Sequence, residues 1–329
     1  MRPHPAAQAA GPDLLLLGEV MRVLVAEPGE ALARADRFRS TVGGAEGNVA
    51  IGAARLGLRT TWVGQVGSDD AGDYVLRRMR AENVAVDHVG VDTDGFTGLL
   101  MRNSSSHGAI SVAYHRTGSA GSRVGAELVR TAWAAGRPRL VHVSGITAMM
   151  STTSMEAMDQ LLSLAKADGV PVSFDINLRL RLAPVDRWRA IVPTVAATAD
   201  IVFAGTAELA LVSADAPLAV ADQLIDGGAT AVVLKNADHS CTVLTADGAV
   251  IQQSLARHVV DPVGAGDALV AGYLSGYLGG ADPAGCLLRG AAVAAFAVET
   301  WSDTEGLPTA AELEQFLAAL HTGGEQVLR

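Results

Sequence analysis

The sequence predicts an α/β protein in which a parallel sheet is covered by helices on both faces. From about residue 125 onward, short apolar strands alternate with helices, as they do in the βαβ units of a parallel sheet. Before that point, several short segments alternate like exposed β-structure, which suits a second, smaller sheet. Both observations together predict a main parallel sheet with a small separate one.

The first part of the chain is predicted to contribute strands to both sheets. Residues 14–17 are an apolar run followed by polar and glycine residues, the pattern of a buried parallel strand. Residues 60–66 are β-branched and strand-like. We predict helices at 47–56 and 70–82. The segments assigned to the small sheet are 21–25, 37–42, 87–91, 97–102 and 110–115.

The second part is predicted to alternate regularly and to end in helices. Its predicted strands are 140–144, 170–175, 201–203 and 231–234. Its predicted helices are 126–135, 154–167, 186–195, helical segments up to 226, 268–278, 284–298 and a last helix to about 320. Asp282-Pro283 is a start signal for the helix at 284–298, and Thr309 with Glu312 forms a capping box for the last one. We expect one domain at 13–322, a disordered tail at 1–12 and a short tail at 323–329.

Composition and charge exclude several classes of protein. The chain is 49% hydrophobic and 18% charged, which excludes global disorder. The formal net charge is −10 and there is no basic stripe, so no nucleic-acid partner is expected. No apolar run approaches the roughly 18 residues of a membrane span, so no membrane partner is expected. Cys241 and Cys286 have no metal-binding spacing and are predicted to be buried thiols in a cytoplasmic, reducing compartment.

The strongest local motif is Asp-Pro-Val-Gly-Ala-Gly-Asp at 261–267, which leads into an apolar helix. The first N–H groups of a helix lack intrahelical partners, and the helix dipole is positive there. Small residues at 264–266 would let an anion approach these groups, so the segment is a candidate phosphate cradle. Asp267 would repel a phosphate, and it makes more sense as a base that deprotonates an attacking hydroxyl. The alternative is a glycine-rich turn with a capping aspartate.

Other nucleotide-binding motifs do not fit. The P-loop pattern Gly-x-x-x-x-Gly-Lys-Ser/Thr is absent from the sequence. The Gly-Ala-Gly at 264–266 lacks the third glycine of the dinucleotide fingerprint and lies late in the chain. A Rossmann dehydrogenase is therefore not predicted.

A second motif is Gly-Gly-Ala-Glu-Gly-Asn at 43–48, at the entry to a helix. Paired glycines allow a ligand to approach the backbone closely. Asn48 offers both a donor and an acceptor to a polyol hydroxyl. The alternative is an ordinary helix-entry turn.

These two motifs, in this order and at this separation, resemble the signatures of the ribokinase-like, or PfkB, family of carbohydrate kinases. Residues 43–57 look like the N-terminal signature of the family and residues 261–272 like its C-terminal one. The resemblance implies a three-layer α/β/α sandwich with a small β-sheet lid built from about residues 20–42 and 96–116. It also implies that the γ-phosphate of ATP is transferred, with Mg²⁺, to a sugar hydroxyl. It leaves open activation by a monovalent cation such as K⁺.

The resemblance also implies roles for individual residues. The last aspartate of the second signature is the base in the family, which places that role on Asp267, with the backbone of Gly264, Ala265 and Gly266 as the anion hole. Implied substrate contacts are Gly43, Gly44, Asn48, Tyr114, Arg116, Arg179 and Asp303. Implied nucleotide contacts are Asn177, Arg179, Lys235, Pro262, Gly264 and Gly266. Glu208 would help to hold Mg²⁺ through water.

Within the family, the middle of the chain is most similar to 2-keto-3-deoxygluconate kinases. The similar segments are residues 96–99, 114–120 and 174–179. A sugar acid carries a carboxylate that an arginine can bind with two parallel hydrogen bonds, and Arg116 and Arg179 are the candidates. The predicted reaction is the phosphorylation of 2-keto-3-deoxygluconate to its 6-phosphate.

The sequence departs from the family pattern at three places. Gly205 stands where the family carries an asparagine, three positions before the candidate metal residue. Leu100 stands where 2-keto-3-deoxygluconate kinases tend to carry a tyrosine. The residues after Lys235 lack the usual glycine-rich turn. These departures concern the bound sugar, the metal and the nucleotide rather than the kinase reaction itself.

Two other functions remain open from the sequence. One is a kinase for a neutral sugar, of the fructokinase or ribokinase type, or for a nucleoside. The other is a non-catalytic regulator that binds a sugar or nucleotide, against which the intact Asp267 argues. We also expect a homo-oligomer, because pairing the exposed edge of the small sheet with another subunit would protect it.

Overall fold

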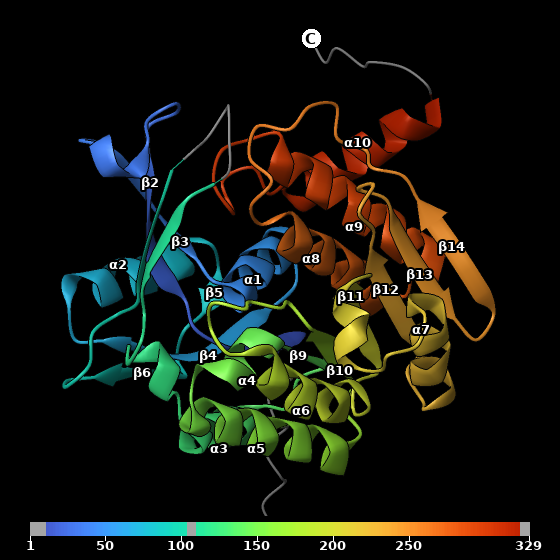
Figure 1. Cartoon of the computed structure of the whole chain (residues 1–329), viewed down its shortest axis with the longest axis horizontal. Helices are drawn as coiled ribbons and strands as arrows, with labels where there is room; N and C mark the ends of the chain where they lie inside the picture. The colour runs from blue at the N-terminus through green and yellow to red at the C-terminus, as the bar shows by residue number, and fades with distance from the viewer. Residues whose placement is uncertain (1–10, 104–109, 323–329) are drawn as a thin grey trace, which may run out of the picture.

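The computed structural model describes residues 11–103 and 110–322. The tail predicted at 323–329 and most of the one predicted at 1–12 lie outside these residues. Within the described part of the chain, ten strands form the main sheet and four form a separate small sheet. Figure 1 shows the main sheet between two layers of helices, with the small sheet to one side. The predicted three-layer α/β/α architecture is confirmed.

The main sheet has the strand order β14-β13-β12-β11-β10-β9-β1-β4-β5, and β6 also pairs with β4. Pairing is parallel from β12 through β5 and antiparallel for the hairpins β12-β13 and β13-β14. The strands are β1 (Leu14–Leu17), β4 (Thr60–Gly67), β5 (Val84–Ala85), β6 (Val89–Asp92), β9 (Leu140–Ser144), β10 (Val172–Asp175), β11 (Ile201–Gly205), β12 (Ala231–Lys235), β13 (Cys241–Thr245) and β14 (Gly248–Gln252).

Each face of the main sheet has its own hydrophobic core, because side chains of a strand alternate between the faces. Leu14 and Leu16 of β1 belong to one core, and Leu15 and Leu17 to the other. The first face is covered by α1 (Ala45–Arg55), α2 (Asp70–Ala81), α8 (Ala265–Leu278), α9 (Pro283–Val298) and α10 (Ala310–Thr322). The second is covered by α3 (Ala126–Ala135), α4 (Gly145–Met150), α5 (Thr152–Asp168), α6 (Val185–Ala196) and α7 (Pro217–Asp226).

Two predicted helix starts are confirmed in atomic detail. The side chain of Asp282 accepts a 2.7 Å hydrogen bond from the N–H of Gly285, with Pro283 in the first turn of α9. At α10, the carboxylate of Glu312 accepts a 2.7 Å bond from the N–H of Thr309. The hydroxyl of Thr309 accepts one of 3.3 Å from the N–H of Glu312, which completes the capping box.

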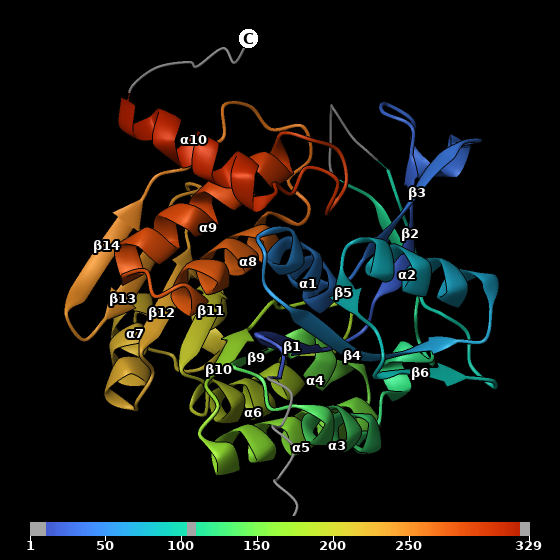
Figure 2. The same ribbon diagram turned by 180° about the vertical axis from the view of Figure 1, so that it is seen from behind.

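The small sheet has the strand order β3-β2-β7-β8. Its strands are β2 (Met21–Ala26), β3 (Phe38–Gly43), β7 (Leu99–Arg102) and β8 (Val112–His115). Pairing is antiparallel except for β2 with β7, which are parallel. Figure 2 shows these strands standing beside α1 and α2, away from the plane of the main sheet. We call this sheet the lid.

One expectation about the sheets was wrong, and one hairpin was not predicted. The strand predicted near 87–91 pairs with β4 in the main sheet rather than with the lid strands. Its alternating pattern reflects a position at the edge of the main sheet, which is half exposed like a lid strand. The hairpin β13-β14 was not predicted, and it extends the main sheet by two antiparallel strands.

The two cysteines are free and buried, as predicted. None of the described helices is long and apolar enough to cross a membrane.

Candidate active site

The candidate residues gather at the carboxyl ends of the parallel strands, where open α/β sheets bind ligands. Asp175 is the last residue of β10 and Lys235 the last of β12. Strand β11 lies between these two strands, and the side chains meet across its carboxyl end. Lys235 Nζ lies 2.7 and 2.9 Å from the two carboxylate oxygens of Asp175. Figure 1 shows the start of α8 and the start of α1 beside this edge. The site is thus made from the ends of several elements.

Asp267 lies in the first turn of α8 and has a perturbed acidity. Its Oδ2 accepts a 2.7 Å hydrogen bond from the side-chain amide of Asn48. Burial raises the pKa of the Asp267 carboxyl to about 7, and the negative charge of Asp175 adds to this. The bond from Asn48 and the positive charges of Arg179 and Lys235 oppose the increase in this pKa. A carboxyl with such a pKa can exchange a proton near neutral pH.

The start of α8 has the geometry of an anion-binding helix terminus. Gly264, which precedes the helix, has φ 83°, a left-handed conformation that favours glycine. A β-carbon at this position would lie 2.7 Å from the backbone oxygen of Asp303. A β-carbon at Gly266 would lie 3.7 Å from Lys235 Nζ, so the ammonium is beside the helix start. The N–H groups and the lysine provide the local dipoles and cation that an anion needs in this acidic protein.

The charge on Lys235 is maintained by its acidic neighbours. Burial disfavours the ammonium, but Asp175 and Glu208 more than offset this and raise the pKa of Lys235 above its ordinary value. Lys235 is therefore positively charged at every physiological pH. Asp175 was not assigned a role from the sequence.

The loop after β10 carries two further candidates, and a third, Glu208, follows β11. Asn177 is buried and adopts the left-handed conformation, with φ 48°. Arg179 is exposed, and its Nη1 donates a 2.9 Å bond to the carbonyl of Leu178. Glu208 accepts 2.7 Å bonds from the N–H groups of Leu178 and Gly205, so it joins this loop to the end of β11. A contact of Glu208 with a metal would have to share oxygens that already hold the backbone.

The start of α1 and the segment after α9 form another side of the site. Gly44 precedes α1 with φ 150°, and a β-carbon there would lie 2.2 Å from the carbonyl oxygen of Glu19. A β-carbon at Gly43 would lie 3.1 Å from Asp303 Oδ2. Asp303 is buried, and its Oδ2 lies 3.5 Å from Asn48 Nδ2. Burial raises the pKa of Asp303, although Arg102 opposes this.

Arg116 already forms an ion pair within the protein. Its Nη2 lies 2.6 Å from Oε2 of Glu19, a side chain that is only 1% exposed. Ser119 donates a hydrogen bond to the other oxygen of Glu19. The ring of Tyr114, which is 40% exposed, lies 5.9 Å from the Arg116 guanidinium. Part of the charge of Arg116 is thus balanced by the protein, a pairing that sequence reasoning missed.

Arg102 was also missed, although the sequence holds a signal for it. Successive side chains of a strand point to opposite faces, so Arg102 in β7 lies on the same face as Leu100, and both are buried. An arginine on the buried face of a strand must be paired, because an isolated buried charge is strongly unfavourable. Its Nη2 lies 2.7 Å from Asp261 Oδ2 and 3.2 Å from Asp303 Oδ1.

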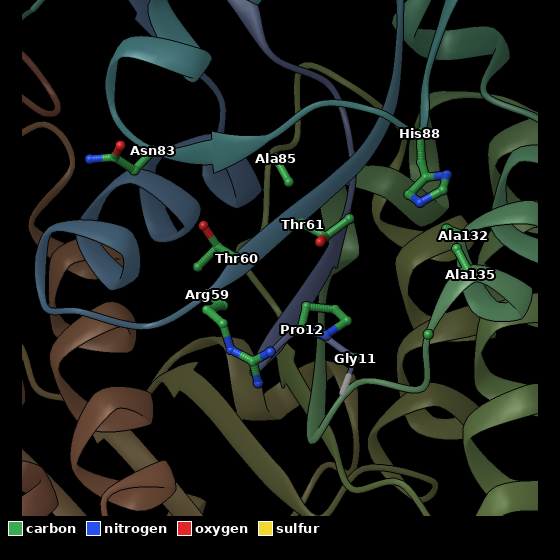
Figure 3. A pocket seen from close by; sticks show the side chains of 11 residues that line it. Gly11, Pro12, Arg59, Thr60, Thr61, Asn83, Ala85, His88, Ala132 and Ala135 are labelled. Carbon is green, nitrogen blue, oxygen red and sulfur yellow. The ribbon is translucent and has the colours of Figure 1, made fainter. Parts of the chain in front are cut away.

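A separate cavity lies away from these residues. It has a volume of about 380 Å³ and is lined, among others, by Pro12, Thr60, Thr61 and His88 (Figure 3). Thr60 and Thr61 begin β4, and Pro12 precedes β1, so the cavity lies at the amino ends of the strands. None of the sequence-predicted site residues lines it.

Comparisons with known proteins agree with the geometry. Residues 12–310 match the model of the "pfkB family carbohydrate kinase". The chain belongs to this family. A 2-dehydro-3-deoxygluconokinase of Bacillus subtilis (strain 168) is 33% identical over 317 residues, which cover 94% of this chain and 97% of that protein. A 5-dehydro-2-deoxygluconokinase of Bacillus licheniformis is 29% identical and covers 86% of this chain and 88% of its own length.

Solved structures of other proteins share the fold. The crystal structure of a PfkB protein from Polaromonas sp. JS666 has a TM-score of 0.81 and 34% identity, and covers 92% of this chain and 99% of its own. A putative ribokinase II from E. coli, in complex with ATP and Mg²⁺, has a TM-score of 0.86 and 22% identity, with coverages of 94% and 99%. The latter likeness concerns the fold alone.

As a pfkB kinase, the protein is an ATP-dependent sugar kinase with a sugar and ATP as its small-molecule substrates. The ribokinase-like fold predicted from the two signatures is confirmed. The roles assigned to individual residues stay predictions.

Proposed function

We propose that the protein phosphorylates 2-keto-3-deoxygluconate at its 6-hydroxyl, with Asp267 as the base. The observation that carries the reaction is the position of Asp267 in the first turn of α8, beside the N–H groups of 264–266. A base and an anion-binding helix terminus within one turn suit transfer of a phosphoryl group to a hydroxyl. The name of the 33% identical relative supports the choice of sugar acid.

Asp267 would accept the proton of the attacking hydroxyl as the phosphoryl group is transferred. Asn48 Nδ2 orients the carboxylate through its 2.7 Å bond. Asn48 Oδ1 is buried, and within the described residues it has no hydrogen-bond partner. An unsatisfied acceptor at this position suits a sugar hydroxyl that donates to it. Asn48 would therefore position both the base and the sugar.

The backbone of Gly264, Ala265 and Gly266 would bind the transferred phosphoryl group, with Lys235 beside it. Donors of this kind act most strongly on the charge that develops in the transition state. Lys235 itself is held in place by Asp175. Arg179 is exposed on the loop after β10. It is close enough to Asp267 to affect the pKa of that carboxyl, and it is free to approach the phosphates.

The nucleotide would lie along the segment that precedes α8. Val260 and Asp261 donate 2.7 and 3.1 Å backbone bonds to the carbonyl of Val298, the last residue of α9. Val259 and Val260 are 63% and 46% exposed, and Pro262 is exposed as well. These apolar side chains beside the anion-binding turn offer a surface for a nucleoside, and Asn177 would complete the binding of the phosphates.

Mg²⁺ would accompany ATP through carboxylates at the ends of β10 and β11. Magnesium is usually held by one or two carboxylates, several waters and the substrate phosphates. Glu208 would act through water, because its oxygens already accept bonds from two backbone N–H groups. Asp175 would have to share oxygens that already bind Lys235. When bound, the ion would neutralise part of the negative charge of the phosphates.

The far end of the sugar acid would be bound under the lid. Arg116 has five N–H donors, and its contacts with Glu19 and Met150 are made by Nη2, so other donors are available to a carboxylate. Tyr114 lies beside it, and Gly43, Gly44 and Asp303 would contact the sugar from the start of α1 and the segment after α9. The competing proposal is a kinase for a neutral sugar, which the Glu19–Arg116 pair favours because it reduces the free positive charge.

The experiment is ADP release from Mg·ATP with 2-keto-3-deoxygluconate, 2-keto-3-deoxygalactonate, fructose, ribose and adenosine. We expect a keto-deoxy acid to be preferred. Preference for a neutral sugar would overturn the proposed substrate but leave the kinase reaction in place.

Asp267→Asn should abolish turnover while the affinity for ATP stays within a few-fold. Asp186→Asn is the matched control, because Asp186 is also in the first turn of a helix but is exposed. Near-normal turnover by Asp267→Asn would refute the assignment of the base.

Rates measured in K⁺ and in Na⁺ buffers test whether a monovalent cation activates the enzyme.

A further inference from the structure

Arg102 is a buried arginine that connects the lid to the body of the protein. It is the last residue of β7, and its side chain is 1% exposed. Its Nη2 lies 2.7 Å from Asp261 Oδ2 and 3.2 Å from Asp303 Oδ1. The two carboxylates belong to different segments, so one guanidinium joins three parts of the fold.

Asp261 sets the shape of the segment that leads into the anion-binding turn. Its Oδ1 accepts a 3.1 Å bond from the N–H of Val263. Its Oδ2, which also faces Arg102, accepts a 3.1 Å bond from the N–H of Ser302. The turn at 261–264 is therefore held by a carboxylate whose charge is balanced from the lid.

Asp303 extends the connection to the candidate base. Asp303 Oδ2 lies 3.5 Å from Asn48 Nδ2, and the same nitrogen donates the 2.7 Å bond to Asp267. The backbone of Asp303 also touches the turn, because a β-carbon at Gly264 would lie 2.7 Å from its carbonyl oxygen. Polar contacts thus connect Arg102 of β7 to Asp267 through Asp303 and Asn48.

The lid also packs on the same segment through apolar contacts. Met21, Val23, Val25 and Leu100 form a small core in the lid, and Trp301 packs against it. Trp301 is followed directly by the buried Ser302 and Asp303. The lid is therefore attached to residues 301–303 by both packing and charge.

We propose that Arg102 is a positioning residue that couples the placement of the lid to the geometry of the anion-binding turn and of Asp267. The proposal rests on the kinase reaction and on the site described under the proposed function. Arg102 touches neither Asp267 nor the helix start; it acts through Asp261 and Asp303. A lid displaced from the body would leave both carboxylates buried without their cation, which is strongly unfavourable. The lid and the turn are thus expected to adopt their active positions together.

This role predicts a specific kinetic signature. Anion-hole donors act mainly on the transition state, so a displaced turn should lower kcat more than it raises KM for ATP. We expect Arg102→Met to lower kcat by roughly 100-fold, in the range observed for loss of one oxyanion-hole donor. Arg102→Lys keeps the charge on a shorter side chain, and we expect a loss of roughly ten-fold in kcat. KM for ATP should stay within about three-fold in both variants.

The matched control is Arg37→Met, directly before the lid strand β3. Arg37 is exposed, so kcat and KM should stay within about two-fold of the wild type. Amide hydrogen exchange of the substrate-free proteins provides a second readout that does not depend on activity. In Arg102→Met and Arg102→Lys, exchange should increase together in residues 99–102 and 261–264, and remain unchanged in α5. Arg37→Met should leave exchange at 261–264 unchanged.

The outcomes separate this proposal from the proposed function. If a neutral sugar is the substrate, the kinetic test is made with that sugar, and the Arg102 prediction is unchanged. If the wild type phosphorylates no sugar in the panel, the exchange measurement decides. If Arg102→Met does not fold, Arg102→Lys decides. A folded Arg102 variant with kcat within about three-fold of the wild type, or with unchanged exchange at 261–264, would overturn the proposal.

Discussion

The acidity of Asp267 makes the pH dependence of this enzyme a direct test of the proposed base. Burial and the charge of Asp175 raise the pKa of its carboxyl to about 7. A base must be ionised, so the rate should be low below this pKa and rise as the pH passes through it. The ionised fraction at a pKa of about 7 grows from about one-tenth at pH 6 to about nine-tenths at pH 8. We therefore expect kcat/KM for the sugar to rise about ten-fold over this range.

A substitution of Asn48 should shift the acid limb of the pH–rate profile. Its side-chain amide donates a 2.7 Å bond to Asp267 Oδ2, which favours the ionised form. Hydrogen bonds to charged groups contribute about 1.5–3 kcal/mol, and one pKa unit corresponds to about 1.36 kcal/mol. Water replaces part of the lost bond in Asn48→Ala, so the apparent pKa should rise by about one unit. The maximal rate should also fall, because the base loses its orientation.

The assay is ADP release at limiting sugar and saturating Mg·ATP between about pH 5.5 and pH 9. Wild type and Asn48→Ala are compared under identical nucleotide conditions, so the ionisation of ATP itself affects both equally. Gln160→Ala, which changes a side-chain amide on the surface of α5, is the control and should keep the wild-type profile. A flat wild-type profile, or an acid limb that does not move in Asn48→Ala, would refute the assignment of this pKa to Asp267.

Four further predictions follow from the structure. Arg116→Ala should raise KM for a sugar acid far more than for a neutral sugar, and equal effects on both would argue against a carboxylate contact. Gly264→Ala places a β-carbon 2.7 Å from the carbonyl oxygen of Asp303 at a φ of 83°, so it should lower kcat and reduce stability by about 1–3 kcal/mol; unchanged thermal unfolding would contradict this. Burial lowers the pKa of His142 to about 3, so the unfolded chain binds the extra proton below about pH 6.5 and stability is lost as the pH falls. Between pH 7 and pH 5 this loss should be about 2 kcal/mol larger in the wild type than in His142→Gln, which can keep the bond to Ser173, and equal losses in urea unfolding would disprove it. Sedimentation should show a homo-oligomer, and a single monomeric species would remove that expectation.

The sequence by itself determined the layers of the fold and the position of the candidate base. Apolar strands alternating with helices specify a covered parallel sheet, because each element must bury one face. The glycines before α8 and the aspartate within its first turn are local features, readable from consecutive residues. The helix starts at Asp282 and Thr309 were correct for the same reason, since a cap involves residues only three positions apart.

Errors arose where a local pattern fits two environments. The segment near 87–91 alternates like a lid strand, but it lies at the edge of the main sheet beside β4. A half-exposed strand has the same sequence pattern in either sheet, because alternation reports exposure and not the partner strand. The hairpin β13-β14 was missed from the sequence, and its second strand is almost entirely exposed.

Only the tertiary structure decided which charges are paired. Arg102 and Asp261 are separated by 159 positions, and Ser119 and Glu19 by 100, so no local pattern could connect them. Arg116 was expected to await a substrate carboxylate, yet Glu19 already contacts it at 2.6 Å. A sequence shows that a charge is present, but its partner is chosen by the packing of distant segments, since a buried charge is stable only where the fold brings its counter-charge within contact.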